Sequence, residues 1–420
     1  EGIRQEVLAE VGQLNRQGLR VLGVGYKSGL REDYAYAVTD ESDMILTGYL
    51  AFLDPPKPSA APAIQALLEH DVRTKILTGD NEKVTQAICE KVGLDVEHML
   101  LGADIDQMTD QELAEAVEKV TVFAKLSPDQ KARIILQLKR NGHVVGYMGD
   151  GINDAPSMKV ADVGISVDTA VDIAKETADV ILLDKDLMVL ETGIVEGRKV
   201  YANMTKYIKM TVSSNFGNIF SLLVASIFLP FLPMAPVHLI VLNLVYDLSC
   251  VALPFDNVDQ DFLKQPHTWE AKSITRFMVW MGPISSVFDI LTFIFLYFII
   301  VPLMTGYHYV HGSESALQFI ILFQTGWFIE SMWSQTMVIH MLRTAKVPFV
   351  QSRPAWLVIL TTLVAAIFVT SLPYGPLVNI LRLAPLGLPY FLFLTCIIFL
   401  YMFSVTVIKK CYIRKYKEWL

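Results

Sequence analysis

The sequence predicts an α/β doubly wound domain followed by an α-helical membrane bundle of six spans. Strand-like and helix-like segments alternate from residue 54 to about residue 184, as in a parallel sheet with helices on both faces. Of the 420 residues, 53% are hydrophobic, which is too many for an ordinary soluble domain. The charges also differ between the two halves. Residues 1–204 contain 34 acidic and 21 basic residues, whereas residues 205–420 contain 9 acidic and 14 basic residues.

Two strands are predicted first, at residues 19–26 and 44–52, joined by a polar loop. A third strand at residues 75–77 ends in a glycine turn, and a helix follows at residues 82–92. Backbone amides and a hydroxyl in such a turn can hold a phosphate group. The residues of this turn are Thr78, Gly79 and Asp80.

A fourth strand ends at Ala124, and the helix after it is predicted to start on Pro128, because proline needs no hydrogen-bond acceptor in the first turn. Lys131 lies in that first turn, where its charge can neutralise a phosphoryl group. A single lysine of this kind is more often an ordinary solvated helix residue. The interpretation of Lys131 as a phosphate-site residue therefore rests on its position between two other phosphate-type motifs.

A fifth strand, within residues 142–148, leads into a turn that opens a helix at about Asn153. Such turns project from the carboxyl end of a sheet, where open α/β sheets bind ligands. Asp150 and Asp154 offer the carboxylate oxygens that Mg²⁺ prefers, and Asn153 can hold a phosphate oxygen. A helix-capping acidic turn is the alternative for this motif taken alone.

The three motifs, in this order, resemble the P domain of P-type ATPases, which belong to the haloacid-dehalogenase superfamily. In that family the residue matching Asp150 binds the catalytic Mg²⁺ beside a phosphorylated aspartate, and the match of Asp154 lies close by. The resemblance implies catalytic roles for Lys131, Asp150, Asn153 and Asp154, with Lys131 stabilising the phosphoryl group. It implies ATP contacts at Thr78, Gly79, Asp80, Lys125 and Lys131. At Lys125 many members have arginine, and a lysine lacks the planar fork for bidentate phosphate contact.

The resemblance also divides the chain into parts. Residues 1–53 correspond to the C-terminal remainder of the nucleotide-binding (N) domain, and residues 54–204 to the phosphorylation (P) domain and its stalk helix. Residues 205–408 correspond to six transmembrane helices, and residues 409–420 to a basic cytoplasmic tail. Asp54-Pro55-Pro56 resembles the hinge by which the chain returns from the N domain to the P domain.

Six apolar segments are each close to the roughly 20 residues that cross a bilayer. The helix that begins near Met188 is expected to continue unbroken through residues 203–205 into the first of them, which would link the phosphate site rigidly to the membrane. The predicted spans are residues 207–229, 237–253, 277–301, 317–341, 356–372 and 388–407.

Loop charges predict the orientation in the lipid bilayer. Lysines and arginines cluster in the connections after the second and fourth spans and in the tail, whereas the alternate connections contain only Arg382. The positive-inside rule then puts the acidic half and the tail in the cytoplasm, in a multi-pass protein of the cell inner (plasma) membrane. Because the acidic half has no basic surface, no nucleic-acid partner is expected.

Polar side chains inside two spans are candidates for binding a transported ion. In the second span Asn243 and Asp247 are four residues apart and share a helix face. A central charge costs about 2.5–3.5 kcal/mol on insertion scales, so Asp247 is expected to face an ion path. Interhelical hydrogen bonding is the alternative for the small polar residues. The first span has five polar residues at helical spacing: Thr211, Ser214, Asn215, Asn218 and Ser221.

These segments resemble the ion-site segments of the fifth and sixth membrane helices of P-type pumps. Calcium pumps have a glutamate at the position of Asn218, and the loss of this negative ligand favours Mg²⁺, which needs fewer carboxylates than Ca²⁺. Asp289 and Glu330, in the third and fourth spans, are ranked second, because they can line the site, relay protons or make buried polar contacts. The expected ligands of the transported ion are Asn215, Asn218, Asn243 and Asp247.

Residues 254–259 and 282–289 most resemble the bacterial magnesium-transporting type of P-type ATPase. The resemblance implies an ATP-driven pump that imports Mg²⁺ while an aspartyl phosphate forms and is hydrolysed. Pumps for Ca²⁺, Ni²⁺ or Co²⁺ are alternatives. So are a membrane-anchored phosphatase of the haloacid-dehalogenase type and a noncatalytic membrane partner that has lost the nucleophile.

The phosphorylated aspartate is expected upstream of Glu1, because no Asp-Lys-Thr-Gly-Thr occurs in the sequence. Thr-Gly-Glu of the actuator domain is also absent. The expected partner is therefore the upstream part of the same polypeptide, with the actuator domain, the first four membrane helices and the rest of the N and P domains. By itself the chain is expected to be inactive, and its oligomeric state is left open.

Overall fold

The computed structural model describes residues 2–28, 37, 40, 42–53, 55–94, 96–184 and 186–419. The chain forms two compact units, Glu1–Ile194 and Val195–Leu420, and each is described here by itself. Asp54 of the expected hinge lies outside the described residues.

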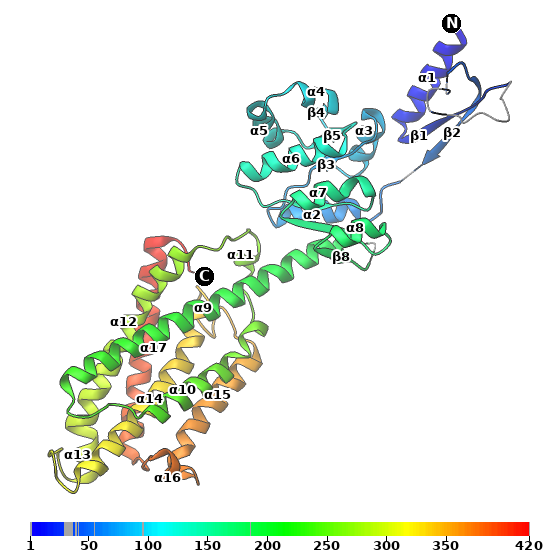
Figure 1. The fold of residues 1–420 in the computed structure, drawn as a ribbon. Coiled ribbons are helices and arrows are strands. Elements are labelled where there is room, and N and C mark those ends of the chain that lie inside the picture. Colours follow the sequence, from blue (N-terminus) through cyan, green and yellow to red (C-terminus); the bar gives the residue numbers. More distant parts are fainter. Residues whose placement is uncertain are drawn as a thin grey trace. The chain divides into compact units, whose positions relative to one another are not determined.

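The first unit begins with helix α1 (Gly2–Arg16) and two antiparallel strands, β1 (Leu19–Tyr26) and β2 (Ile45–Leu53), shown in blue in Figure 1. Leu19 pairs with Leu53, and a bulge between Val24 and Gly25 shifts the register near the far end. Both strands that were predicted at the start of the chain are therefore confirmed.

The rest of this unit is an α/β domain in which all strand pairs are parallel, as predicted. The strands form two three-stranded sheets, in the orders β3-β5-β4 and β6-β7-β8, instead of the single doubly wound sheet expected. Strands of two to five residues offer few ladder hydrogen bonds, and β3 and β6 are edge strands in the described chain. The strands are β3 (Ile76–Leu77), β4 (Met99–Leu101), β5 (Val122–Ala124), β6 (Gly146–Met148), β7 (Val163–Val167) and β8 (Val180–Leu182).

Helix α6 separates two hydrophobic clusters, because its neighbouring residues Ile134 and Ile135 point in different directions. Ile134 packs with Phe123, whereas Ile135 packs with Tyr147. Leu77 contacts both clusters and so joins the two layers. The helices of this domain are α2 (Ala60–Glu69), α3 (Glu82–Lys91), α4 (Gly102–Gln107), α5 (Asp110–Lys119), α6 (Pro128–Arg140), the 3₁₀ turn η2 (Ile152–Asp154), α7 (Ala155–Val160) and α8 (Asp172–Thr177).

The second unit is a helical bundle around one large apolar core (Figure 1). Helix α9 (Met188–Phe228) spans 41 residues without a break at residues 203–205, as the sequence predicted. The other elements are α10 (Pro236–Cys250), η3 (Leu253–Phe255), α11 (Gln260–Leu263), α12 (Ala271–Phe295), the π-helical segment η4 (Leu296–Ile300), α13 (Val301–Thr305), α14 (Ala316–Leu342), α15 (Trp356–Ser371), η5 (Leu372–Tyr374), α16 (Val378–Leu381) and α17 (Leu388–Tyr416).

Five helices in the described part of the chain are long and apolar enough to cross a membrane, one fewer than predicted. They are α9, α10 with η3, α12 through α13, α15 with η5, and α17. Helix α14 has 27 residues and matches the predicted fourth span, but polar residues such as Glu330 and Gln335 lower its mean hydropathy. It packs against α10, α12, α15 and α17, so other helices rather than lipid surround much of its polar surface.

Candidate functional site

The turns after β3 and β5 lie side by side, because backbone hydrogen bonds join them. Lys125 N donates to Asp80 O at 2.9 Å, and Leu126 N donates to Thr78 O at 3.0 Å. The Thr78 hydroxyl also accepts from the backbone N–H of Asp80 at 3.1 Å, which stabilises the turn. Asn81 then caps α3 by accepting from two backbone amides. The first two predicted motifs are therefore brought together.

Lys125 leaves β5 in a left-handed conformation, with φ of 53°, which is uncommon for a residue other than glycine. Its ammonium pairs with Glu82 at 2.8 Å, in the first turn of α3. The hydrogen bond from Lys125 lowers the pKa of Glu82. The two side chains are 51% and 40% exposed, so solvent screens this ion pair and it contributes little to stability.

Lys131 joins the second motif to the third. Ser127 and Gln130 form a capping box at the start of α6, with Pro128 in the first turn, and this fixes the position of Lys131. The Lys131 ammonium contacts Asp154 Oδ1 at 2.9 Å, and both side chains are mostly buried.

Asp154 also accepts a hydrogen bond from the Tyr147 hydroxyl, at 2.7 Å and on the same oxygen, Oδ1. Its other oxygen, Oδ2, accepts from Gly151 N at 3.3 Å. Burial raises the pKa of Asp154, but the hydrogen bonds from Lys131 and Tyr147 lower it further, so the carboxyl is ionised at neutral pH. Burial and the neighbouring Asp154 raise the pKa of Tyr147 well above its ordinary value.

Asp150 and Asn153 are exposed at the same turn, and in the described chain neither side chain has a hydrogen-bond partner. A free exposed carboxylate at the end of β6 fits the oxygen ligands of Mg²⁺. Asp154 fits less well as a direct ligand, because Lys131 and Tyr147 already occupy one of its oxygens. Gly149 allows this packing, since a Cβ there would collide with Asp154.

Tyr147 was missed as a site residue by the sequence reasoning, which placed it only inside the strand. A signal was present, because a buried tyrosine usually needs a partner for its hydroxyl and this one adjoins the acidic turn. No group of three His, Cys, Asp or Glu side chains suited to a metal occurs among the residues described.

The expected ion ligands in the bundle do not form one site. Asn215, Asn243 and Asp247 are exposed on α9 and α10, and in the described part of the chain none of them makes a side-chain hydrogen bond. Asn218 is half-buried and accepts from Gln335 Nε2 at 3.3 Å, so it faces α14 instead.

Asp289 and Glu330 lie deep in the bundle, at 4% and 1% exposure. Asp289 accepts from the Ser221 hydroxyl at 2.6 Å and from Trp327 Nε1 at 2.9 Å. The partners that the sequence required for a buried acid are therefore present for Asp289, whereas Glu330 Oε2 is buried without a hydrogen-bond partner among the described residues. Beside Asp289 lies a cavity of about 20 Å³, large enough for one water molecule, with Asn218 also in its wall.

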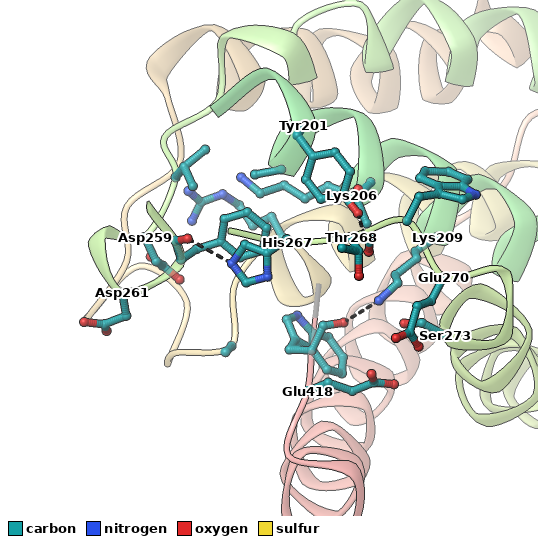
Figure 2. Close-up of a pocket in the computed structure, with 18 of the residues that line it drawn as sticks. Tyr201, Lys206, Lys209, Asp259, Asp261, His267, Thr268, Glu270, Ser273 and Glu418 are labelled. Atoms are coloured by element: carbon teal, nitrogen blue, oxygen red, sulfur yellow. Dashed lines mark hydrogen bonds between the residues drawn. The ribbon is translucent and has the colours of Figure 1, made fainter. Parts of the chain in front are cut away.

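A larger cavity of about 460 Å³ lies at the end of the bundle that contains α11 and the C-terminal residues (Figure 2). Its walls are strongly charged, but it contains none of the predicted site residues. Lys206 is paired with the buried Asp256, and the Lys209 ammonium donates to the carbonyl of Trp419 at 3.0 Å. Glu418, also in the wall, pairs with Arg276 at 3.4 Å.

Two family models match the chain. Residues 6–162 match "haloacid dehalogenase-like hydrolase", and residues 231–411 match "Cation transporting ATPase, C-terminus". A haloacid-dehalogenase-like domain followed by the C-terminal bundle of a cation-transporting ATPase defines the class of protein. The chain belongs to the P-type ATPase family.

Individual relatives support this placement. "Magnesium-transporting ATPase, P-type 1" of Escherichia coli K12 is 51% identical over 96% of this chain, and a protein of the same name from Salmonella typhimurium LT2 is 48% identical over 99%. The "Calcium-transporting ATPase" of Bacillus subtilis is 33% identical over 70%. The chain spans 44% and 45% of the length of the first two relatives.

Proposed function

We propose that the chain is the C-terminal part of an ATP-driven pump that imports Mg²⁺, with an aspartyl phosphate formed and hydrolysed in each cycle. The proposal rests on one observation, the ion pair between Lys131 and Asp154 of the third motif, next to the exposed carboxylate of Asp150. The names of the relatives at 48–51% identity support Mg²⁺ as the transported ion.

The phosphate site is proposed to be completed by one more strand. β3 and β6 both carry phosphate motifs at their carboxyl ends, and both are edge strands of their sheets. A parallel strand between them would use the free edges of both and would join the sheets into one. Its carboxyl end would lie between Thr78 and Asp150, which is where the nucleophilic aspartate of the full-length pump is needed.

Each side chain has a separate task in this proposal. Asp150 would hold the catalytic Mg²⁺, which neutralises phosphoryl charge when bound. Lys131, fixed by Asp154, places a positive charge against the transferred group. Asn153 and Thr78 donate hydrogen bonds to phosphoryl oxygens, and the turn of Thr78, Gly79 and Asp80 meets the phosphate end of ATP together with Lys125.

The transport site is proposed to lie on the exposed face of α9 and α10. Placing an uncompensated carboxylate at the middle of the bilayer costs about 2.5–3.5 kcal/mol of free energy, so exposure of Asp247 to lipid is unfavourable. We infer that the membrane helices of the upstream part cover this face and close the site around Asp247, Asn243 and Asn215. Asn218 already accepts a hydrogen bond from Gln335 of α14, so it is ranked behind these three, followed by Asp289 and Glu330.

The orientation is also part of the proposal. The connections α10–α12 and α14–α15 and the C-terminal tail contain the lysines and arginines, so these segments are assigned to the cytoplasm with the phosphate site. The remaining connections then face the outside of the inner membrane. Mg²⁺ bound at Asp247 would thus be released toward the side where ATP is used.

The test is Asp247→Asn in the full-length pump, reconstituted in liposomes. We expect Mg²⁺-stimulated ATP hydrolysis and Mg²⁺ uptake to fall at least about tenfold, because the one carboxylate of the site is lost. Asp261→Asn, which changes an exposed acid outside the spans, is the matched control and should transport normally. Unchanged Mg²⁺ turnover in Asp247→Asn would refute this transport site, and Ca²⁺, Ni²⁺ or Co²⁺ stimulation in place of Mg²⁺ would refute the ion.

A further inference from the structure

We propose that Tyr147 is a positioning residue of the phosphoryl-transfer site, whose hydroxyl holds Asp154 so that Lys131 can face the phosphoryl group. The inference rests on the proposed function and adds a residue to that site. Tyr147 lies in the middle of β6 and its side chain is 9% exposed.

The geometry places two donors on one oxygen. The Tyr147 hydroxyl at 2.7 Å and the Lys131 ammonium at 2.9 Å both reach Oδ1 of Asp154. A carboxylate oxygen has two acceptor sites, so the two donors together saturate it. The backbone N–H of Gly151 holds the other oxygen from the turn. Donors from β6, α6 and the turn therefore fix the orientation of this carboxylate.

This arrangement controls how strongly Asp154 attracts Lys131. An ammonium has three N–H donors, and in the described structure one of them is used on Asp154. The hydroxyl of Tyr147 shares the charge of Oδ1 without adding a positive charge that would repel Lys131. Without the hydroxyl, the carboxylate loses one of the three donors that orient it, and Lys131 becomes its only strong donor. Lys131 would then be drawn toward Asp154 and away from a transferred phosphoryl group.

A packing role is the simpler alternative, since the ring of Tyr147 belongs to the cluster of Ile135, Met158, Ala170 and Ala174. Tyr147→Phe separates the two roles, because phenylalanine keeps the ring and removes the hydroxyl. It leaves no buried acceptor without a donor, as Lys131 and Gly151 still contact Asp154. If Tyr147→Phe weakens phosphoryl binding without a matching loss of stability, the weakening is due to the missing hydroxyl.

The experiment uses the full-length pump and orthovanadate, a phosphate analogue, as the probe. We expect Tyr147→Phe to weaken inhibition by orthovanadate and to lower kcat, each about 3- to 30-fold, with the KM for ATP unchanged. Ile135→Val, a packing change in the same cluster, is the control. It should lower the melting temperature and leave orthovanadate inhibition as in the wild type.

The outcomes are distinguishable from failure of the proposed function. If the wild-type pump shows no phosphorylation by ATP, the function itself is wrong. If the wild type is active and Tyr147→Phe matches it in kcat and in orthovanadate inhibition, the positioning role is wrong. A parallel loss of stability and orthovanadate inhibition in both variants would also overturn it, in favour of packing.

Discussion

Asp256 is predicted to be essential for the stability of the bundle, and Asp256→Asn tests this. Its side chain is completely buried in the loop after η3. One oxygen accepts from the Lys206 ammonium at 2.9 Å and from Arg343 Nε at 2.7 Å, and the other accepts from Ala355 N at 3.1 Å. Burial raises the pKa of Asp256, but the two cations lower it further, so the group is ionised.

The size of the effect follows from what the substitution leaves behind. Asparagine keeps the shape and one acceptor oxygen but removes the negative charge. Lys206 and Arg343, whose side chains are 2% and 1% exposed, would then be two buried cations without a carboxylate. Removing one partner of a buried ion pair typically costs about 3–5 kcal/mol. Asp261→Asn is the control, because its pair with Lys346 is largely exposed and should contribute little.

The assay is unfolding of the full-length protein in detergent by titration with SDS, followed by circular dichroism. Asp256→Asn should unfold at a clearly lower SDS fraction than the wild type, and Asp261→Asn at the same fraction. A loss below about 1 kcal/mol for Asp256→Asn, within the range of ordinary substitutions, would refute the reasoning. It would mean that the cluster relaxes, for instance by admitting water to the buried cations.

Two further predictions concern a helix contact and pH. Gly217→Ala should destabilise the bundle by about 1–3 kcal/mol, because the new Cβ would lie 2.9 Å from Gly282 O. Gly193→Ala is the control and should stabilise α9 by about 0.5–1 kcal/mol, because a Cβ there would have no atom within 4 Å. Equal effects of the two substitutions in SDS unfolding would refute the contact between Gly217 and Gly282. The pKa of Asp154 is lowered, so the stability from its pair with Lys131 is complete above the ordinary carboxyl pKa of about 3.9 and is lost as pH falls through the lowered value. Thermal unfolding from pH 7 to pH 3 should show this loss in the wild type and not in Asp154→Asn.

The motif turns could be predicted because their signals are local. The preference of proline for the first turn placed the start of α6 at Pro128, where the structure has it. The helix after the first motif was predicted at residues 82–92 and is observed at Glu82–Lys91. The helix after the third motif was expected near Asn153, but a 3₁₀ turn comes first and α7 begins at Ala155.

Contacts between distant residues could not be predicted in this way. Lys206 and Arg343 are 50 and 87 residues from Asp256, and a buried ion pair leaves no local periodic pattern. The division into two sheets was missed for a related reason, since alternation of strands and helices does not specify which strands pair. The burial of α14 also depends on its neighbours, and this explains how a helix with Glu330 at its centre fits into the bundle.

The polar residues of the bundle separate into two groups by how they are satisfied. Asp289 has donors from α9 and α14, and Asn218 has one from α14, so the bundle itself stabilises these groups. Asp247 and Asn243 have no such donors among the described residues, and their side chains are exposed on α10, a helix apolar enough to cross a membrane. In a bilayer the second group requires oxygen-binding partners from elsewhere, either protein or a cation. The residues that this unit leaves unsatisfied are therefore the stronger candidates for a site completed by other helices. This is why Asp247 is placed ahead of the better-buried Asp289.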